Sequence, residues 1–313
     1  MCSYPMKRKI WWAAAILVIV MCSYVTLVSV PKEAIFRPLN PVTNSPADVG
    51  LIFENFVTSP TDADITLAGW WMPAEQARAT LVFIHGGGSN RYSKFFDSFN
   101  FYRAMVDRGV GVVVVDLRNH GNSGGDGKGL QFGLTEKHDA MAAIEWARLK
   151  NPQLPIFAMG LSMGGATVIH AAHDGAKLNG LILLDSLLDT TDTFRQGAWV
   201  GTGISPALFA ASAWSASAYF GLPTGSNQAL ELAVNLDLPI LAIQDPDDPV
   251  TRAQYSSELA VRNPRVTLWT APPIPADHPD LEYKGRWGTH VAAFKHYPQE
   301  TVALIMQFVN AHR

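Results

Sequence analysis

The segment Gly160–Gly165 reads Gly-Leu-Ser-Met-Gly-Gly and directly follows the apolar run Ile156–Met159. A Gly-x-Ser-x-Gly pattern between a strand and a helix describes a sharp turn, which strains the serine backbone and lifts its hydroxyl above the sheet edge. The turn leaves no room for side chains two residues before and after Ser162, so glycine stands at both places. A helix predicted to start after Ser162 would present free N–H groups that favour a developing oxyanion. Ser162 is therefore the candidate nucleophile.

The rest of the chain places this turn in an α/β architecture. Continuous apolar runs alternate with helical stretches, which predicts a mostly parallel, doubly wound sheet covered on both faces. Two earlier strands, Glu54–Thr58 and Ile65–Trp71, predict an antiparallel opening. The later strands are expected at Thr80–Ile84, Gly111–Val115, Pro155–Met159, Gly180–Leu184, Pro239–Ile243 and Val266–Trp269. The helices between and after them are expected at Phe95–Arg108, Thr135–Lys150, Met163–His173, Ala253–Val261 and Thr301–His312.

The N-terminus forms a separate unit. Residues 10–30 carry no charge, and a helix of this length spans the ~30 Å hydrocarbon core at about 1.5 Å per residue. The basic residues at 7–9 precede it, which favours a cytoplasmic N-terminus at 1–9 and an extracytoplasmic domain. A cleaved signal peptide is the alternative, although Pro31 follows the best small-residue site. The Pro-rich residues 31–48 are interpreted as a linker and 49–313 as the folded domain.

Composition excludes several classes of protein. The chain is 48% hydrophobic and 16% charged, which is typical of a globular protein rather than a disordered one. The formal net charge is −3 and no basic cluster follows residue 30, so nucleic acid is not an expected partner. Both cysteines, Cys2 and Cys22, precede the domain, which leaves it without a disulfide framework or a cysteine metal site.

An uncharged insert separates the two halves of the predicted sheet. Residues 196–230 contain no charged side chain and are rich in Ala, Ser and Gly. A second membrane span here would separate Ser162 from the strands that follow, so a helical cap over about 187–235 is favoured. Its apolar underside would suit a hydrophobic substrate. Additional core packing and a membrane-dipping surface are the alternatives.

A serine nucleophile needs a base that a carboxylate orients, and in this architecture the chain order is serine, acid, histidine. The loop after the strand Pro239–Ile243 offers Asp245, Asp247 and Asp248. Asp248 is favoured because it precedes the next helix. Asp245 comes soonest after the strand and is interpreted as structural, and Asp247 is interpreted as a solvated turn residue. Asp185, at the end of the previous strand, is a lower-ranked alternative.

His290 is the predicted base. It lies after the last strand and before the final helix, and Gly288 before it lets the loop fold back over the serine. The other histidines after the insert are His278, His296 and His312.

These other histidines are given no catalytic role. His278 lies in a Pro-rich loop between Asp277 and Asp280, a weak metal signal for which a solvated loop is preferred. His296 is expected to be superficial and His312 is terminal. No metal site and no cofactor are predicted.

The oxyanion hole is assigned to the loop His85–Gly88, which reads His-Gly-Gly-Gly after an apolar strand. Glycines let backbone N–H groups approach a substrate oxygen closely. Gly87 is the first choice and Gly88 the second, paired with the N–H of Met163. The loop lacks both the Walker lysine and the dinucleotide spacing of a phosphate-binding loop.

Together these motifs resemble the α/β-hydrolase superfamily over roughly residues 50–313, in particular membrane-anchored serine hydrolases related to serine aminopeptidases and carboxylesterases. The matching residues are His85–Gly88, Asp116–Ser123, Gly160–Gly165, Asp248, and His290 with Phe294. The block Asp116–Ser123 resembles a structural Asp-x-Arg-Gly-x-Gly-x-Ser loop of that family, with Asn119 in place of the first glycine and His120 after it. The resemblance implies a Ser-His-Asp triad without a cofactor.

The expected activity is hydrolysis of a carboxylic ester, with a lipid-like ester or a thioester among the candidate substrates, through an acyl-enzyme intermediate. An aminopeptidase that binds a free amino terminus would need acidic residues in its cap, and the middle of this insert has none. An aminopeptidase-like peptidase and a non-catalytic hydrolase-fold binding protein are the alternatives. The expected partners are a small acyl ester and the membrane, and the sequence identifies no protein partner.

Overall fold

The computed structural model describes residues 4–313 and contains one 8-stranded sheet in the order β1-β2-β4-β3-β5-β6-β7-β8. The strands are β1 (Glu54–Thr58), β2 (Leu67–Met72), β3 (Ala79–Ile84), β4 (Val110–Val115), β5 (Ile156–Leu161), β6 (Gly180–Leu184), β7 (Ile240–Gln244) and β8 (Val266–Thr270). The first helices are α1 (Tyr4–Tyr24), α2 (Val30–Ile35), α3 (Ser98–Val106), α4 (Lys137–Lys150), α5 (Met163–His173) and α6 (Thr190–Thr202). The later helices are α7 (Ala210–Phe220), α8 (Ala229–Val234), α9 (Ala253–Arg262), α10 (Pro279–Lys284), α11 (Ala293–His296) and α12 (Pro298–His312). Short 3-10 or π segments are η1 (Val25–Ser29), η2 (Pro46–Val49), η3 (Pro206–Phe209), η4 (Gly225–Asn227) and η5 (Gly285–Trp287).

The sheet confirms the predicted parallel strands and antiparallel opening. β2 pairs antiparallel with both β1 and β4, and all the other neighbouring strands run parallel. β3 lies between β4 and β5, so the chain crosses over between β3 and β4. Ile84 at the end of β3 pairs with Gly160 near the end of β5, which brings the loops after these two strands side by side. The loop Gly86–Gly88 and the serine turn therefore share one edge of the sheet.

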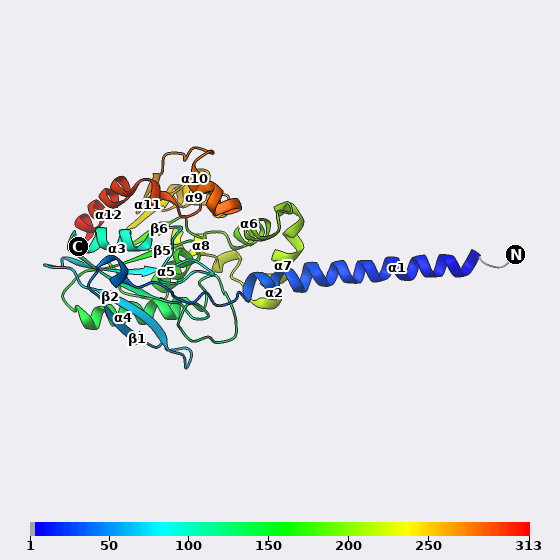
Figure 1. The fold of residues 1–313 in the computed structure, drawn as a ribbon, viewed down its shortest axis with the longest axis horizontal. Helices are drawn as coiled ribbons and strands as arrows, with labels where there is room; N and C mark the ends of the chain where they lie inside the picture. Colours follow the sequence, from blue (N-terminus) through cyan, green and yellow to red (C-terminus); the bar gives the residue numbers. More distant parts are fainter. Residues whose placement is uncertain (1–3) are drawn as a thin grey trace.

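Helices cover both faces of the sheet, as the apolar strands require (Figure 1). One buried cluster lies under α4, α5, α8 and α9, and the other lies under α3, α11 and α12. The strands β3, β4 and β5 are buried along their whole length. Both faces are thus apolar, and the chemically active residues are left to the loops at the carboxyl ends of the strands.

The N-terminal helix projects away from the domain, with the N-terminus at its far end (Figure 1). The continuous helix Lys9–Ile35 has 27 residues and an apolar stretch of mean hydropathy 2.4, which suffices to cross a membrane by length and composition. It continues through Pro31 beyond the predicted span 10–30. Pro31 and Ile35 are buried, so the first residues of the predicted linker are helical and packed on the domain.

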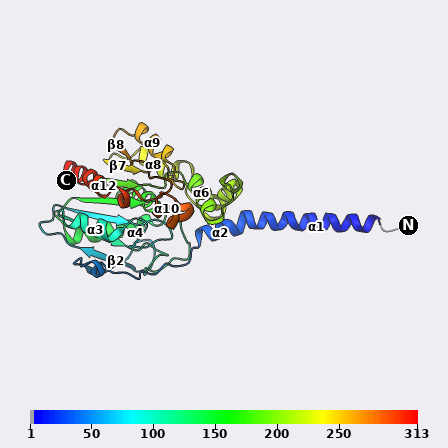
Figure 2. The same cartoon turned by 45° about the horizontal axis from the view of Figure 1, so that its top comes forward.

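The uncharged insert forms the second half of α6, all of α7 and the start of α8. Helices α6 and α7 lie beside α2 at the foot of the N-terminal helix (Figure 2). The hydroxyl of Ser215 on α7 donates a hydrogen bond to the backbone carbonyl of Leu27. The aromatic rings of Phe36 and Phe220 pack edge to face, with centroids 6.3 Å apart. The insert is therefore helical, as predicted, and it packs against the base of the N-terminal helix.

Candidate active site

The turn at Ser162 has the strained backbone that its sequence predicts. Ser162 lies between β5 and α5 with φ 51° and ψ −119°, values that L-residues rarely adopt. A Cβ at Gly160 would lie 2.2 Å from the carbonyl oxygen of Gly164, and one at Gly164 would lie 2.3 Å from the carbonyl oxygen of Ile84. Glycine at both positions therefore answers a steric requirement.

Three residues predicted from separate parts of the sequence come together at this turn. His290 Nε2 lies 3.0 Å from Ser162 Oγ, and His290 Nδ1 lies 2.7 Å from Asp248 Oδ2. The two contacts fit a neutral imidazole that donates its Nδ1–H to the carboxylate and accepts the serine hydroxyl at Nε2. The Asp248 side chain is fully buried and that of His290 is 6% exposed.

The loop after β7 holds Asp248 as an acceptor. Its Oδ1 accepts the backbone N–H groups of Val250 (2.7 Å) and Thr251 (3.0 Å), and its Oδ2 accepts the hydroxyl of Thr251 (2.7 Å). The rival candidates lie elsewhere: Asp245 accepts the hydroxyl of Thr289 (2.9 Å), and Asp247 is exposed. Of the three aspartates in this loop, Asp248 is the one bonded to His290.

Asp185 joins the two loops that carry Asp248 and His290. It is fully buried, has φ 42°, and accepts the backbone N–H groups of Asp245 (2.7 Å) and Val291 (2.9 Å). Burial, reinforced by the charge of Asp248, raises the pKa of Asp185 well above its usual range. Sequence reasoning considered Asp185 only as a rival acid, because its bridging contacts are invisible along the chain.

Two further residues contact His290 and went unnoticed in the sequence. The buried Lys284 Nζ donates to the carbonyl oxygen of His290 at 3.0 Å. Burial lowers the pKa of Lys284 to about 8. The ring of Trp287 stacks on the imidazole with centroids 5.7 Å apart. These contacts hold the histidine loop at both its backbone and its ring.

The oxyanion candidates Gly87 and Met163 are close neighbours. A Cβ at Gly87 would lie 3.2 Å from Met163 Sδ, and one at Gly86 would lie 3.2 Å from Ser162 Cβ. The N–H of Gly88, the second choice, donates to His120 Nε2 at 3.0 Å. Among residues 4–313, no hydrogen-bond acceptor is found for the N–H of Gly87 or Met163. Gly87 therefore fits the role better than Gly88.

Two buried histidines fix the loop that carries Gly87. His85 Nε2 accepts the N–H of Leu117 (3.1 Å), and its Nδ1 faces the carbonyl of Gly86 (2.8 Å). Burial lowers the pKa of His85 to about 4 and that of His120 to about 3. Both imidazoles are therefore neutral, and their hydrogen bonds hold the loop in place. Asn119 has φ 60°, a conformation that asparagine tolerates, which explains how it replaces the expected glycine.

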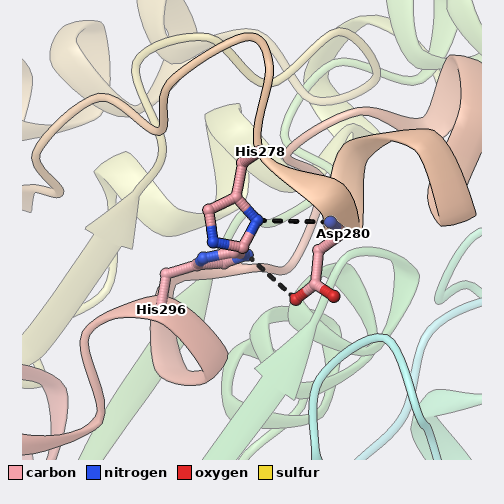
Figure 3. Close-up of side chains that lie close together, drawn as sticks. All are labelled: His278, Asp280 and His296. Carbon is pink, nitrogen blue, oxygen red and sulfur yellow. Dashed lines mark hydrogen bonds and ion pairs between the residues drawn. The ribbon is translucent and has the colours of Figure 1, made fainter.

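Within the described residues, the other histidines after the insert form no hydrogen bond with Ser162. The ring of His312 packs at a tilt against that of Phe308 within α12, with centroids 4.8 Å apart. His278 and His296 lie together with Asp280 (Figure 3). The expectation of a superficial His296 is wrong: its side chain is only 8% exposed, because the segment that carries His278 folds over it.

Comparison with known proteins agrees with this architecture. The sequence model of the serine aminopeptidase family (S33) matches residues 75–219, a range that includes Gly87 and Ser162 and ends before Asp248. Monoglyceride lipases of Mus musculus and Homo sapiens are each 25% identical to the chain, over 132 and 141 residues that cover 41% and 43% of it. The matched segments span 41% and 45% of those relatives, less than half of their length.

Solved structures resemble a larger part of the chain. An esterase of Pyrococcus furiosus superposes on 88% of this chain and 99% of its own with a TM-score of 0.69 at 20% identity. The acylaminoacyl peptidase of Pyrococcus horikoshii covers 83% of this chain and 41% of its own, with a TM-score of 0.57 at 18% identity. The sheet order, the serine turn and these likenesses define an α/β-hydrolase fold. The partial match to the S33 family model agrees with this fold.

Proposed function

We propose that this chain is a membrane-anchored serine hydrolase that cleaves carboxylic esters of lipid-like character through an acyl-enzyme. The observation that carries the proposal is the pair of contacts from Ser162 Oγ to His290 Nε2 (3.0 Å) and from His290 Nδ1 to Asp248 Oδ2 (2.7 Å). A nucleophile, a base within reach of its proton and a buried carboxylate that orients the base are the parts that acyl transfer requires.

The proposed reaction follows from these positions. Ser162 Oγ attacks the ester carbonyl carbon while His290 Nε2 takes the hydroxyl proton, and Asp248 stabilises the imidazolium that forms. The N–H groups of Gly87 and Met163 hold the negative oxygen of the tetrahedral intermediate. His290 then gives its proton to the departing alcohol, which leaves the acyl group on Ser162. A water molecule, deprotonated by His290, attacks the acyl carbonyl; the bond to Ser162 Oγ breaks, His290 returns the proton to Oγ, and the carboxylic acid leaves.

The charges of the cap favour an ester over a peptide with a free amino terminus. All four acids of residues 187–237 have partners: Asp189 accepts the N–H of Asp192 at the start of α6, and the other three pair with arginines. Those pairs are Asp192 with Arg252, Glu231 with Arg262, and Asp237 with Arg265. A substrate ammonium group would have to compete with an arginine for three of these four carboxylates. The S33 match keeps an aminopeptidase as the second candidate.

Two features support a substrate drawn from a membrane. The helix Lys9–Ile35 is long and apolar enough to span a bilayer, and the basic residues 7–9 before it favour a cytoplasmic N-terminus. On the cap beside its foot, Trp214 and Tyr219 are 59% and 73% exposed. Aromatic side chains of this kind favour the membrane interface. We therefore place the catalytic domain on the extracytoplasmic surface, with its cap against the lipid.

The test uses the full chain in detergent micelles. A fluorophosphonate probe is expected to label the wild type and not Ser162→Ala, and folding of the variant is checked by its thermal transition. Rates on p-nitrophenyl esters of increasing chain length are expected to exceed rates on aminoacyl anilides. Faster anilide cleavage would instead identify a peptidase. Equal labelling of Ser162→Ala would place the reactive group at another residue, and no labelling of the folded wild type would favour a non-catalytic role; either result would overturn the proposal.

A further inference from the structure

Outside the proposed active site, two histidines and one aspartate gather at the junction of α10 and α11 (Figure 3). His278 precedes α10, Asp280 lies in its first turn, and His296 ends α11. One nitrogen or carboxylate oxygen from each residue lies within 4.8 Å of the other two. The imidazole rings of His278 and His296 meet edge to face, with centroids 4.5 Å apart.

The second observation is an unpaired nitrogen that points into this cluster. The His296 side chain is 8% exposed, and its buried Nε2 has no hydrogen-bond partner within the described part of the chain. Asp280 Oδ2 lies 3.6 Å away, too far for a good hydrogen bond. A buried polar atom without a partner costs free energy, so a water or a cation bound in this gap would stabilise the fold.

We propose that His278, Asp280 and His296 bind one divalent cation of the Zn²⁺ class, with water in the remaining position. Two imidazoles with one carboxylate suit Zn²⁺, whereas Mg²⁺ and Ca²⁺ prefer all-oxygen sites. At Zn–ligand distances of about 2.0–2.1 Å, tetrahedral ligand atoms lie ~3.3 Å apart. The present separations of up to 4.8 Å therefore need only side-chain rotation to reach that geometry.

Two existing contacts compete with the cation and lower the affinity expected of the site. Lys295 Nζ lies 2.7 Å from Asp280 Oδ2, and the N–H of Asp280 donates to His278 Nδ1 at 3.2 Å. The Lys295 side chain is partly exposed and can turn into solvent. Binding therefore exchanges one long hydrogen bond and one surface ion pair, each of small net value, for three metal bonds.

The proposed metal site also joins the two ends of the segment that carries His290. Its ligands at 278–280 and 296 bracket the segment that carries His290, and Lys284 at the end of α10 bonds the His290 carbonyl at 3.0 Å. A bound cation would thus hold both ends of that segment. This consequence rests on the proposed function, whereas metal binding itself does not.

In the test, the full chain is stripped with a chelator, incubated with excess Zn²⁺ or Co²⁺ and desalted before bound metal is measured. Wild type is expected to retain one Zn²⁺ per chain and to give the visible absorption of Co²⁺ bound by nitrogen. His296→Ala and Asp280→Asn are expected to bind at least about tenfold more weakly. Lys295→Met, which removes the rival cation, is expected to bind more tightly. His173→Ala, at a surface histidine that also contacts an aspartate, is the matched control and should bind like wild type.

The outcomes separate this site from catalysis. Measurements repeated in Ser162→Ala should give the same metal stoichiometry, because binding requires no turnover. If wild type retains no metal, or if His296→Ala binds as tightly as His173→Ala, the proposal is overturned whatever the esterase activity. His296→Gln, with its thermal transition, serves where the alanine variant does not fold.

Discussion

Replacing Asp185 by alanine should separate the alignment of the catalytic loops from the chemistry itself. The buried carboxylate accepts the N–H of Asp245 at 2.7 Å and that of Val291 at 2.9 Å. Asp185→Ala leaves both N–H groups buried without an acceptor, at about 1–3 kcal/mol each. The free energy of unfolding should therefore fall by about 2–6 kcal/mol, a large share of the 5–15 kcal/mol typical of a domain.

The effect on catalysis follows from the neighbours of these two N–H groups. Val291 is adjacent to His290, and Asp245 begins the loop that carries Asp248. A displacement of about 1 Å between reacting groups costs roughly 10²-fold in rate. We expect kcat on a short p-nitrophenyl ester to fall about 10²-fold with KM nearly unchanged, because Asp185 positions these loops without touching the substrate.

The assay counts active molecules so that lost folding is not mistaken for lost alignment. Rates are measured well below the melting temperature and divided by the number of sites that react with a fluorophosphonate. Asp247→Ala, on the exposed part of the same loop, is the control and should keep the wild-type kcat. If Asp185→Ala turns over at the wild-type rate per reactive site, the positioning role is refuted and only a structural role remains.

Three further predictions test steric fit, burial and membrane contact. Gly160→Ala should abolish folding, because its Cβ would lie 2.2 Å from a carbonyl oxygen. Gly197→Ala, on an open face of α6, should instead raise the free energy of unfolding by up to about 1 kcal/mol, and thermal unfolding compares the two variants. Burial raises the pKa of Glu136 to about 7. The protonated side chain therefore contributes fully to the free energy of unfolding below the ordinary pKa of about 4.5, and this contribution disappears as the pH rises through 7. Urea unfolding should therefore show Glu136→Gln gaining about 3 kcal/mol relative to wild type between about pH 4 and pH 8, and a pH-independent difference would contradict this. Trp214→Ser with Tyr219→Ser should lower hydrolysis of a long-chain ester in vesicles several-fold while leaving a soluble short-chain ester unaffected, and equal losses on both would argue against the membrane contact.

Much of the fold could be predicted because its signals are local. The strand Glu54–Thr58 and the helix Met163–His173 begin and end where the sequence predicts. Turn-forming residues follow the strand, and the glycine-rich turn at Ser162 starts the helix. By contrast, the position of β3 between β4 and β5 depends on pairing between distant segments, which the alternation of strands and helices does not specify.

The candidate site divides in the same way. Ser162 is indicated by the glycines around it, since the steric demand of the turn acts within five residues. Asp185 reaches Val291 across 106 positions of the chain, and Lys284 bonds His290 through a backbone carbonyl that carries no sequence signal. His296 misled the prediction because its burial comes from a segment more than ten residues earlier. Side chains that hold catalytic loops are thus harder to predict than the residues they hold.

The N-terminal helix shows how tertiary contacts can also overrule a local signal. Proline lacks an N–H, so in an α-helix Pro31 would leave the carbonyl four residues earlier, that of Leu27, without its partner and would normally end or kink the helix. A π-helical turn at Val25–Ser29 precedes it here. The helix continues to Ile35, and the hydroxyl of Ser215 on the cap donates to the carbonyl of Leu27. The missing hydrogen bond is thereby replaced by one between the cap and the helix. The proline that favoured a loose linker in the sequence instead creates the acceptor that joins the cap to the proposed membrane anchor.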